Sequence, residues 1–157
     1  MADKSKLGME FPPYTYVVER GKVAEFATAV AQKDGKLQVN PIYVDAEAAK
    51  KEGYKDVIIP PTMQTSFSMW SGGGLGDLIG VLGIDLGRLL HGEEEYEYFG
   101  EINPGDAMTG KTKIVQMYDK EKKNQPGKFM EFTVMETEIR NQRAELVLKT
   151  RTTIVER

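Results

Sequence analysis

Cysteine is absent from this chain of 157 residues, and histidine occurs once, at His91. The lack of cysteine excludes disulfides and thiol nucleophiles, and it fits a cytoplasmic location. A single imidazole excludes a zinc site built from histidine and cysteine, and a Ser-His-Asp triad has only His91 to draw on. His91 stands beside Gly92 on an expected strand, which favours a structural role. We therefore expect no metal and no cofactor.

Long apolar runs and an excess of positive charge are also absent. The longest apolar stretch, around Leu75 to Leu90, is interrupted by glycine and aspartate and is too short to cross a bilayer. The segment Met1 to Lys6 is polar and no apolar segment follows it, so we expect no signal peptide. The net charge is −3 and the pI is about 5.3. These values argue against general affinity for nucleic acid.

The length and composition indicate one globular domain. Hydrophobic residues make up 40% of the chain and charged residues 29%, as in ordinary globular proteins with a single sizeable core. Residues 1–12 are polar and end in proline, so we expect a loose N-terminal lead-in there. The domain itself is expected to span residues 13–157.

The first half of the chain predicts helices. The expected helices are Arg20 to Gln32, Ala46 to Glu52, Thr62 to Trp70, and a short one at Leu75 to Leu82. In the first of them, apolar residues fall at i, i+3, i+4 and i+7. Asp45 is a favourable N-cap for the second. The third follows Pro60-Pro61, and Gly72-Gly73-Gly74 is expected to end it.

The hydrophobic period changes to two from Leu89 onward, which predicts antiparallel strands. The expected strands are Leu90 to Tyr98, Thr109 to Tyr118, Phe129 to Ile139 and Ala144 to Val155. In the last of them we expect Ala144, Leu146, Leu148 and Ile154 to point inward. Helices followed by a run of strands define an α+β fold, with one curved sheet and helices on one face.

The segment Asn40-Pro41-Ile42-Tyr43-Val44-Asp45 resembles the D-x-N-P-I-H-x-D motif of the MaoC-like dehydratases and (R)-specific enoyl-CoA hydratases. Further segments occur in the order of that family, and in particular of its FAS1-type dehydratase N-terminal branch. They are Ile59-Pro60-Pro61-Thr62, the stretch His91 to Tyr98, and Asn103-Pro104-Gly105-Asp106. The resemblance implies the hot-dog fold, an antiparallel sheet wrapped around a central helix, here Thr62 to Trp70.

In that family the first Asp and the His of the motif form the acid/base pair that adds or removes water. Here Gln38 and Tyr43 occupy those two positions. Gln38 does not titrate, and an unperturbed tyrosine has a pKa of about 10. No catalytic residue is therefore assigned. The resemblance implies substrate-binding roles for Asn40, Tyr43, Pro61, Thr62, Met63 and Phe67. Among them, the backbone N–H of Thr62 is expected to polarise the thioester carbonyl.

The resemblance thus implies a non-catalytic subunit of a 3-hydroxyacyl thioester dehydratase or enoyl-CoA hydratase. Such a subunit binds acyl-CoA or acyl-ACP beside a catalytic subunit with the intact D-x-N-P-x-H motif. Three alternatives stay open: a free-standing enzyme that uses Tyr43 or Asp45, a hot-dog thioesterase, and a binding module without a thioester ligand. The thioesterase is disfavoured because residues 62–71 contain no Asp or Glu. An exposed edge strand predicts a homodimer or a heteromer with a catalytic MaoC-like relative.

Overall fold

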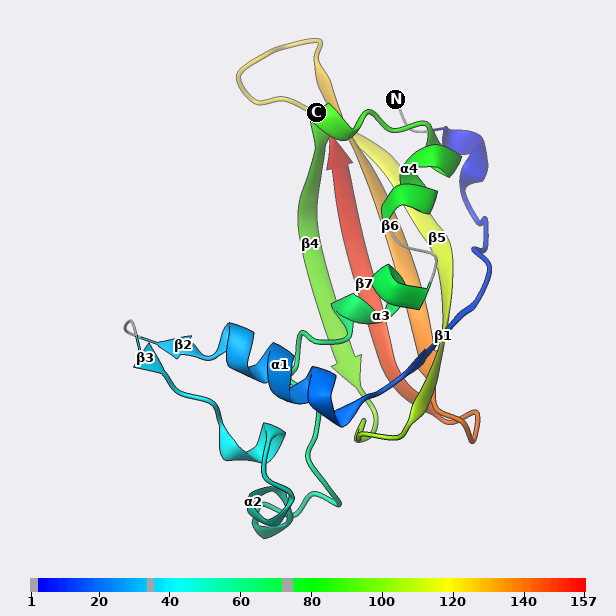
Figure 1. Ribbon diagram of the computed structural model, residues 1–157. Helices are drawn as coiled ribbons and strands as arrows, with labels where there is room; N and C mark the ends of the chain where they lie inside the picture. The colour runs from blue at the N-terminus through cyan, green and yellow to red at the C-terminus, as the bar shows by residue number, and fades with distance from the viewer. Residues whose placement is uncertain (1–2, 34–35, 72–74) are drawn as a thin grey trace.

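The computed structural model describes residues 3–33, 36–71 and 75–157. Its main sheet has five antiparallel strands in the order β1-β5-β6-β7-β4 (Figure 1). The strands are β1 (Tyr14–Val17), β4 (Leu89–Tyr98), β5 (Ala107–Glu121), β6 (Phe129–Arg140) and β7 (Leu146–Glu156). The four strands expected in the second half are therefore present, with ends that shift by a few residues.

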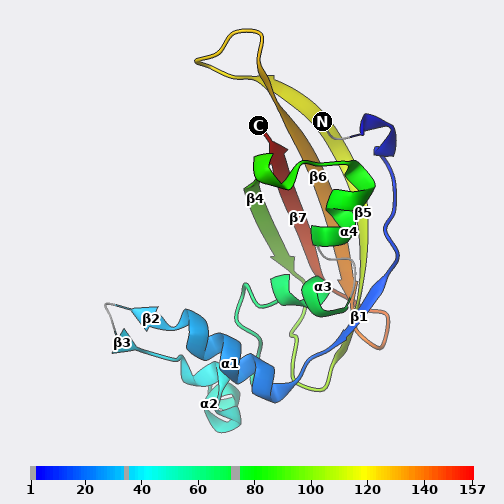
Figure 2. The same cartoon turned by 45° about the horizontal axis from the view of Figure 1, so that its top comes forward.

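Two short helices, α3 (Thr65–Ser71) and α4 (Leu75–Leu82), lie on one face of the sheet, which curves around them (Figures 1 and 2). Phe67 of α3 is fully buried beside residues of β1, β5 and β7. Leu82 of α4 is buried against Ile114, Met135 and Ile154 of the sheet. The expected α+β architecture, a hot-dog fold with a sheet wrapped around a central helix, is confirmed.

The expected start of the central helix at Thr62 is wrong, because α3 begins at Thr65. Residues 61–64 form a turn before it. In this turn the N–H of Met63 donates to the carbonyl of Pro60 (2.9 Å), and the N–H of Thr65 donates to that of Thr62 (3.2 Å). These contacts span three residues, so the chain winds more tightly than an α-helix before α3 starts. The expected break at residues 72–74 lies outside the described residues.

A smaller group of elements extends from one end of the sheet (Figure 1). It comprises α1 (Arg20–Val30), the hairpin of β2 (Gln32–Lys33) and β3 (Lys36–Leu37), the 3-10 helix η2 (Pro41–Tyr43) and α2 (Ala46–Lys51). The helix α1 stops two residues before the expected Gln32, because Gln32 already pairs with Leu37 in the hairpin. The carboxylate of Asp45 accepts hydrogen bonds from the N–H groups of Glu47 and Ala48, as expected of the N-cap of α2.

The expected inward position of Ala144 is wrong, because Ala144 belongs to the turn between β6 and β7. It has a positive φ of 59° and is exposed. The side-chain oxygen of Asn141 accepts from the N–H groups of Arg143 (3.0 Å) and Glu145 (3.1 Å). These two hydrogen bonds hold the chain in a reversal until Leu146, where β7 begins.

The described part of the expected lead-in, residues 3–12, runs along β5 (Figure 2). It includes the short 3-10 helix η1 (Lys4–Lys6). The N–H of Gly8 donates to the carbonyl of Ile114 (2.9 Å), and the N–H of Phe11 donates to that of Thr112 (2.9 Å). We call residues 3–13 the N-terminal strap. Its mobility in solution stays a prediction.

The sheet ends in β1 on one side and in β4 on the other. β1 has four residues, whereas β4 has ten, and a long free edge is a template for pairing with another chain. The chain exposes 9429 Å². A monomer of this mass is expected to expose about 7,900 Å². The surplus of about 1,500 Å² is close to twice the roughly 800 Å² that each partner buries in a typical protein–protein interface.

Replacing Phe67 by alanine is expected to destabilise the fold strongly. Phe67 is fully buried and stacks on Tyr16 with ring centroids 4.5 Å apart. Its loss leaves a cavity, so the free energy of unfolding should fall by about 3–5 kcal/mol in urea denaturation. Met69→Ala is the matched control in the same helix, because Met69 is 69% exposed. It should change stability by less than about 0.5 kcal/mol. Equal losses from both variants would contradict the described packing.

Candidate functional site

The motif residues 40–43 form a capped 3-10 turn. Asn40 is extended, as expected before a proline, and its side-chain oxygen accepts a hydrogen bond from the N–H of Ile42 (3.2 Å). The carbonyl of Asn40 accepts from the N–H of Tyr43 (3.1 Å). Asn40 therefore shapes the turn, and its role in binding a substrate stays a prediction.

Tyr43 of η2 lies close to Tyr98 at the end of β4. Burial, together with the phenols of Tyr96 and Tyr43, raises the pKa of Tyr98 to about 12. The hydroxyl of Tyr98 donates to the carbonyl of Pro61 (2.7 Å). One cluster therefore joins the motif turn, the end of the edge strand and the approach to α3.

Tyr43 is not poised to act as a base. Burial raises its pKa above the ordinary value of 10.0, and the neighbouring Tyr54 raises it further. A tyrosine base near neutrality needs the opposite shift, because only the phenolate accepts a proton. The geometry therefore favours Tyr43 as a neutral, packed phenol.

Gln38 lies apart from this cluster. It directly follows β3, which projects away from the sheet (Figure 1). It is exposed, and its backbone N–H donates to the carbonyl of Ala31 (3.0 Å). Within the described part of the chain its side chain makes no hydrogen bond. Gln38 and Tyr43, which occupy the positions of an acid/base pair in the resembling family, are thus not linked by a hydrogen bond here.

The approach to α3 is rich in hydrogen-bond donors. Thr62 is exposed, and its carbonyl accepts from the hydroxyl of Thr65 (2.8 Å). Its N–H donates to no acceptor among the described residues. Gln64 is only 5% exposed, and its side-chain nitrogen also has no partner within the described residues. A buried unpaired donor is costly unless a water or a ligand satisfies it.

Gln64 is the residue that sequence reasoning missed. It lies beside Tyr96 on the inner face of β4. Burial and the neighbouring Glu94 raise the pKa of Tyr96 to about 12, and the Gln64 amide opposes this rise. Burial likewise raises the pKa of Glu94, the next residue on the same face, with Thr152 and His91 opposing the shift. In the sequence, Gln64 is a single glutamine within an apolar helix pattern. This pattern does not indicate which side chains lie beside it in the fold.

Met63 and Phe67, which we expect to contact substrate, are buried in the core. Met63 is 1% exposed and Phe67 is fully buried. Both belong to the cluster beneath α1 and β1, with Val23 and Ile59. In this structure they support the turn at Pro61 from below, and their contact with an acyl chain stays a prediction.

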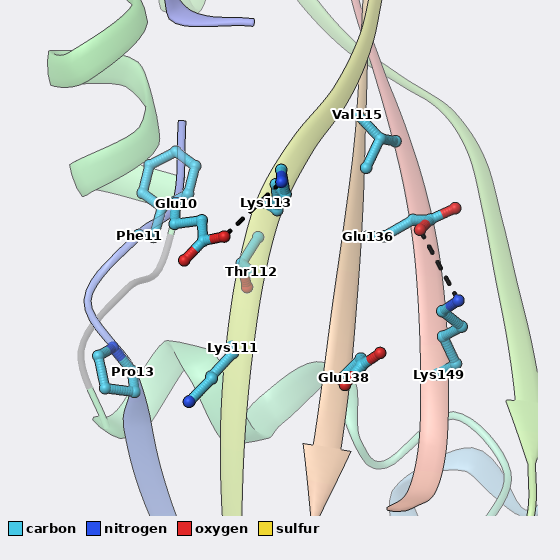
Figure 3. A pocket seen from close by; sticks show the side chains of 10 residues that line it. All are labelled: Glu10, Phe11, Pro13, Lys111, Thr112, Lys113, Val115, Glu136, Glu138 and Lys149. Atoms are coloured by element: carbon cyan, nitrogen blue, oxygen red, sulfur yellow. Dashed lines mark ion pairs between the residues drawn. The ribbon is translucent and has the colours of Figure 1, made fainter. Parts of the chain in front are cut away.

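A hollow of about 430 Å³ lies on the outer face of the sheet, the face turned away from α3 and α4 (Figure 3). Charged side chains line it. Lys113 lies 3.7 Å from Glu10 of the strap, and Lys149 lies 3.8 Å from Glu136. No site residue expected from the sequence lines this hollow, so we assign it no function. The residues described in the structure include no group of three metal-ligating side chains and no helix fit to cross a membrane.

Comparisons with known proteins agree with the fold. The chain resembles one subunit of the HadBC (3R-hydroxyacyl-ACP dehydratase) complex from Mycobacterium tuberculosis, with a TM-score of 0.74, 21% identity and coverage of 96% of each chain. It also resembles a MaoC-like dehydratase with a TM-score of 0.76 and 23% identity, covering 98% of this chain and 42% of that one. At this identity the likeness establishes the hot-dog fold alone.

The sequence comparisons define the family. A UPF0336 protein of Streptomyces coelicolor is 39% identical over 108 residues, which cover 68% of this chain and 67% of that protein. A sequence profile described as "FAS1-like, dehydratase domain region" matches residues 5–150. The chain therefore belongs to the FAS1-like dehydratase family.

Replacing Tyr98 by phenylalanine is expected to loosen the link between β4 and Pro61. The variant loses one hydrogen bond, so the free energy of unfolding should fall by about 0.5–1.5 kcal/mol in urea denaturation. Tyr118→Phe is the matched control, because the hydroxyl of Tyr118 makes no hydrogen bond within the described residues and its ring stacks on Phe132. A loss from Tyr118→Phe as large as that from Tyr98→Phe would contradict the assigned bond.

The raised pKa of Tyr43 predicts a titration result. Its phenol should stay mostly neutral until the pH exceeds the ordinary tyrosine value of 10.0 in the folded chain. The difference in tyrosinate absorbance between the native chain and Tyr43→Phe should therefore have its midpoint above that value. The pKa of Tyr43 is higher in the folded chain than in the unfolded chain, so the neutral phenol stabilises the fold at lower pH. This contribution to the free energy of unfolding is lost as the pH rises through the pKa of the folded chain. A difference already present near pH 7 would show that Tyr43 is an activated base.

Proposed function

We propose that this chain is a non-catalytic subunit of a 3-hydroxyacyl thioester dehydratase or enoyl-CoA hydratase. The observation that carries the proposal is that neither of the two motif positions holds a side chain able to transfer protons near neutrality. Gln38 has no titratable group, and the pKa of Tyr43 moves away from neutrality. Dehydration needs a base for the α-proton and an acid for the leaving hydroxyl. The chain offers neither at these positions, so a partner with an intact D-x-N-P-x-H motif supplies both.

The donors before α3 support a remaining role in thioester binding. The free N–H of Thr62 and the buried amide of Gln64, which faces the Tyr96 phenol, stand beside the Tyr98–Pro61 contact. Enolate charge develops on the thioester carbonyl during the reaction, and fixed donors at that oxygen lower the barrier. The ligand in this proposal is an acyl-CoA or acyl-ACP thioester that reaches the seam between this chain and its catalytic partner.

A free-standing enzyme with altered acid/base groups is the second candidate. In this candidate, Tyr43 or Asp45 takes the place of the acid/base pair. The carboxylate of Asp45 is engaged as the cap of α2, and a tyrosine with a raised pKa is a poor base near neutrality. A hot-dog thioesterase needs an acidic residue close to the central helix, and α3 contains none.

A hydration assay on crotonyl-CoA tests the proposed function. The purified chain alone should give almost no rate. Addition of a catalytic MaoC-like subunit from the same genome should give a rate above that of either subunit alone. It should exceed the rate of this chain alone by about 10²–10⁴-fold, because proton transfer is the step that this chain lacks. The control is the same mixture with the motif histidine of that subunit replaced by alanine, which should be inactive. Hydration by the chain alone, abolished in Tyr43→Phe, would instead establish the free-standing enzyme.

A further inference from the structure

Polar side chains cross the inner face of the sheet between its two apolar clusters. In one row of directly opposite residues, Thr112 of β5 is followed by Thr137 of β6, Thr150 of β7 and Tyr96 of β4. The hydroxyls of Thr112 and Thr137 lie 2.8 Å apart, and Thr137 and Thr150 are buried. This row separates the cluster under α3 from the cluster under α4.

At β4 the row is joined by an acidic and an amide side chain. Glu94 lies opposite Thr152 and two residues before Tyr96, so Glu94 and Tyr96 point to the same inner face. The Tyr96 phenol lies between the Glu94 carboxylate and the Gln64 amide, and it interacts with both. Glu94 is exposed, Tyr96 is half-buried and Gln64 is buried. We call Gln64, Glu94, Tyr96 and Thr152 the polar strip, which leads from the surface to the inside.

The polar strip begins next to the turn that carries the free N–H of Thr62. Tyr98 holds the carbonyl of Pro61 at this turn, and Tyr96 and Glu94 follow at two-residue steps on the same face of β4. Each step is about 7 Å long. An acyl chain that extends from a carbonyl at Thr62 along the inner face of β4 therefore passes Tyr96 and then Glu94.

A plain alkyl chain suits this lining poorly. It would cover the Glu94 carboxylate, the Tyr96 phenol and the Gln64 amide without offering them a hydrogen-bond partner, and such desolvation costs free energy. A hydroxyl group both donates and accepts. It can donate to the carboxylate of Glu94 while it accepts from the amide of Gln64 or from the phenol of Tyr96. A site built in this way discriminates against the analogue that lacks the hydroxyl.

We propose that the polar strip selects thioesters whose acyl chain carries a hydroxyl group beyond the two carbons that gain or lose water. Glu94 accepts a hydrogen bond from that hydroxyl, and Gln64 or Tyr96 donates one to it. These side chains determine which acyl group binds, and they move no proton in the reaction. The inference deepens the proposed function and rests on it for one point, that the thioester carbonyl lies at Thr62.

The binding of two matched thioesters to the full chain tests this selectivity. The probes are hexanoyl-CoA and 6-hydroxyhexanoyl-CoA, which share all of the CoA and differ in one hydroxyl. An extended chain of six carbons has about the length of one two-residue step, so its terminal hydroxyl reaches Tyr96. In isothermal titration calorimetry the native chain should bind the hydroxylated thioester at least about tenfold more tightly. Equal binding, or tighter binding of hexanoyl-CoA, would overturn the inference.

Variants of the polar strip locate the selectivity. Glu94→Leu and Tyr96→Phe should each lower the preference for the hydroxylated thioester, while hexanoyl-CoA binds at least as tightly as it binds the native chain. The matched control is Glu95→Leu, because Glu95 is the next residue of β4 and points to the outer face. It should keep the native preference. A control that loses the preference as completely as Glu94→Leu would show that the polar strip is not its source.

Loss of the selectivity and loss of the thioester-binding role give different results. If both thioesters bind equally, the selectivity of the strip is refuted and the thioester-binding subunit remains. If neither thioester binds, the inference is refuted together with the thioester-binding role. The hydration assay then judges separately whether the chain needs a catalytic partner.

Discussion

The burial of one face of a single sheet against two short helices is the constraint on which this structure depends. Phe67 and Leu82 lie in two separate clusters, one under each helix. Because the helices cover only the inner face, the outer face stays in water and carries charge. The same arrangement brings the turn before α3 to the end of β4, where Tyr98 holds Pro61. The core cluster of Met63 and Phe67 packs under this turn and holds the donors of Thr62 and Gln64 at the end of β4.

The site keeps hydrogen-bond donors, whereas its two motif positions lack groups that exchange protons near neutrality. Tyr43, Tyr96 and Tyr98 all have pKa values raised by burial, so each phenol acts as a neutral donor or packing group. Under the proposed function, this chain polarises the thioester and a partner subunit moves its protons. The long free edge of β4 lies next to these tyrosines.

Sequence reasoning reached the fold because the strands have a clear period of two and the motif stretches occur in family order. It placed α3 too early, since the turn geometry after Pro60-Pro61 depends on contacts that span three residues. It counted Ala144 as a strand residue because alternation says nothing about the Asn141 turn. It overlooked Gln64, whose significance arises only from its burial beside Tyr96. Local sequence patterns thus predict helices and strands well, whereas contacts between side chains from distant segments follow only from the three-dimensional structure.

The strand order also determines when the chain can complete its fold during synthesis. β4 pairs with β7, the last strand of the sequence, and β1 pairs with β5, almost one hundred residues further along. Contacts of such separation form slowly, since loop closure precedes any gain from pairing. The β1 flank can form once residue 110 has left the ribosome, whereas the β4 flank waits for β7, which ends at Glu156. Until then the nascent β4 lacks β7, its one neighbour in the sheet, and early contact with a chaperone or a subunit already made would shield it.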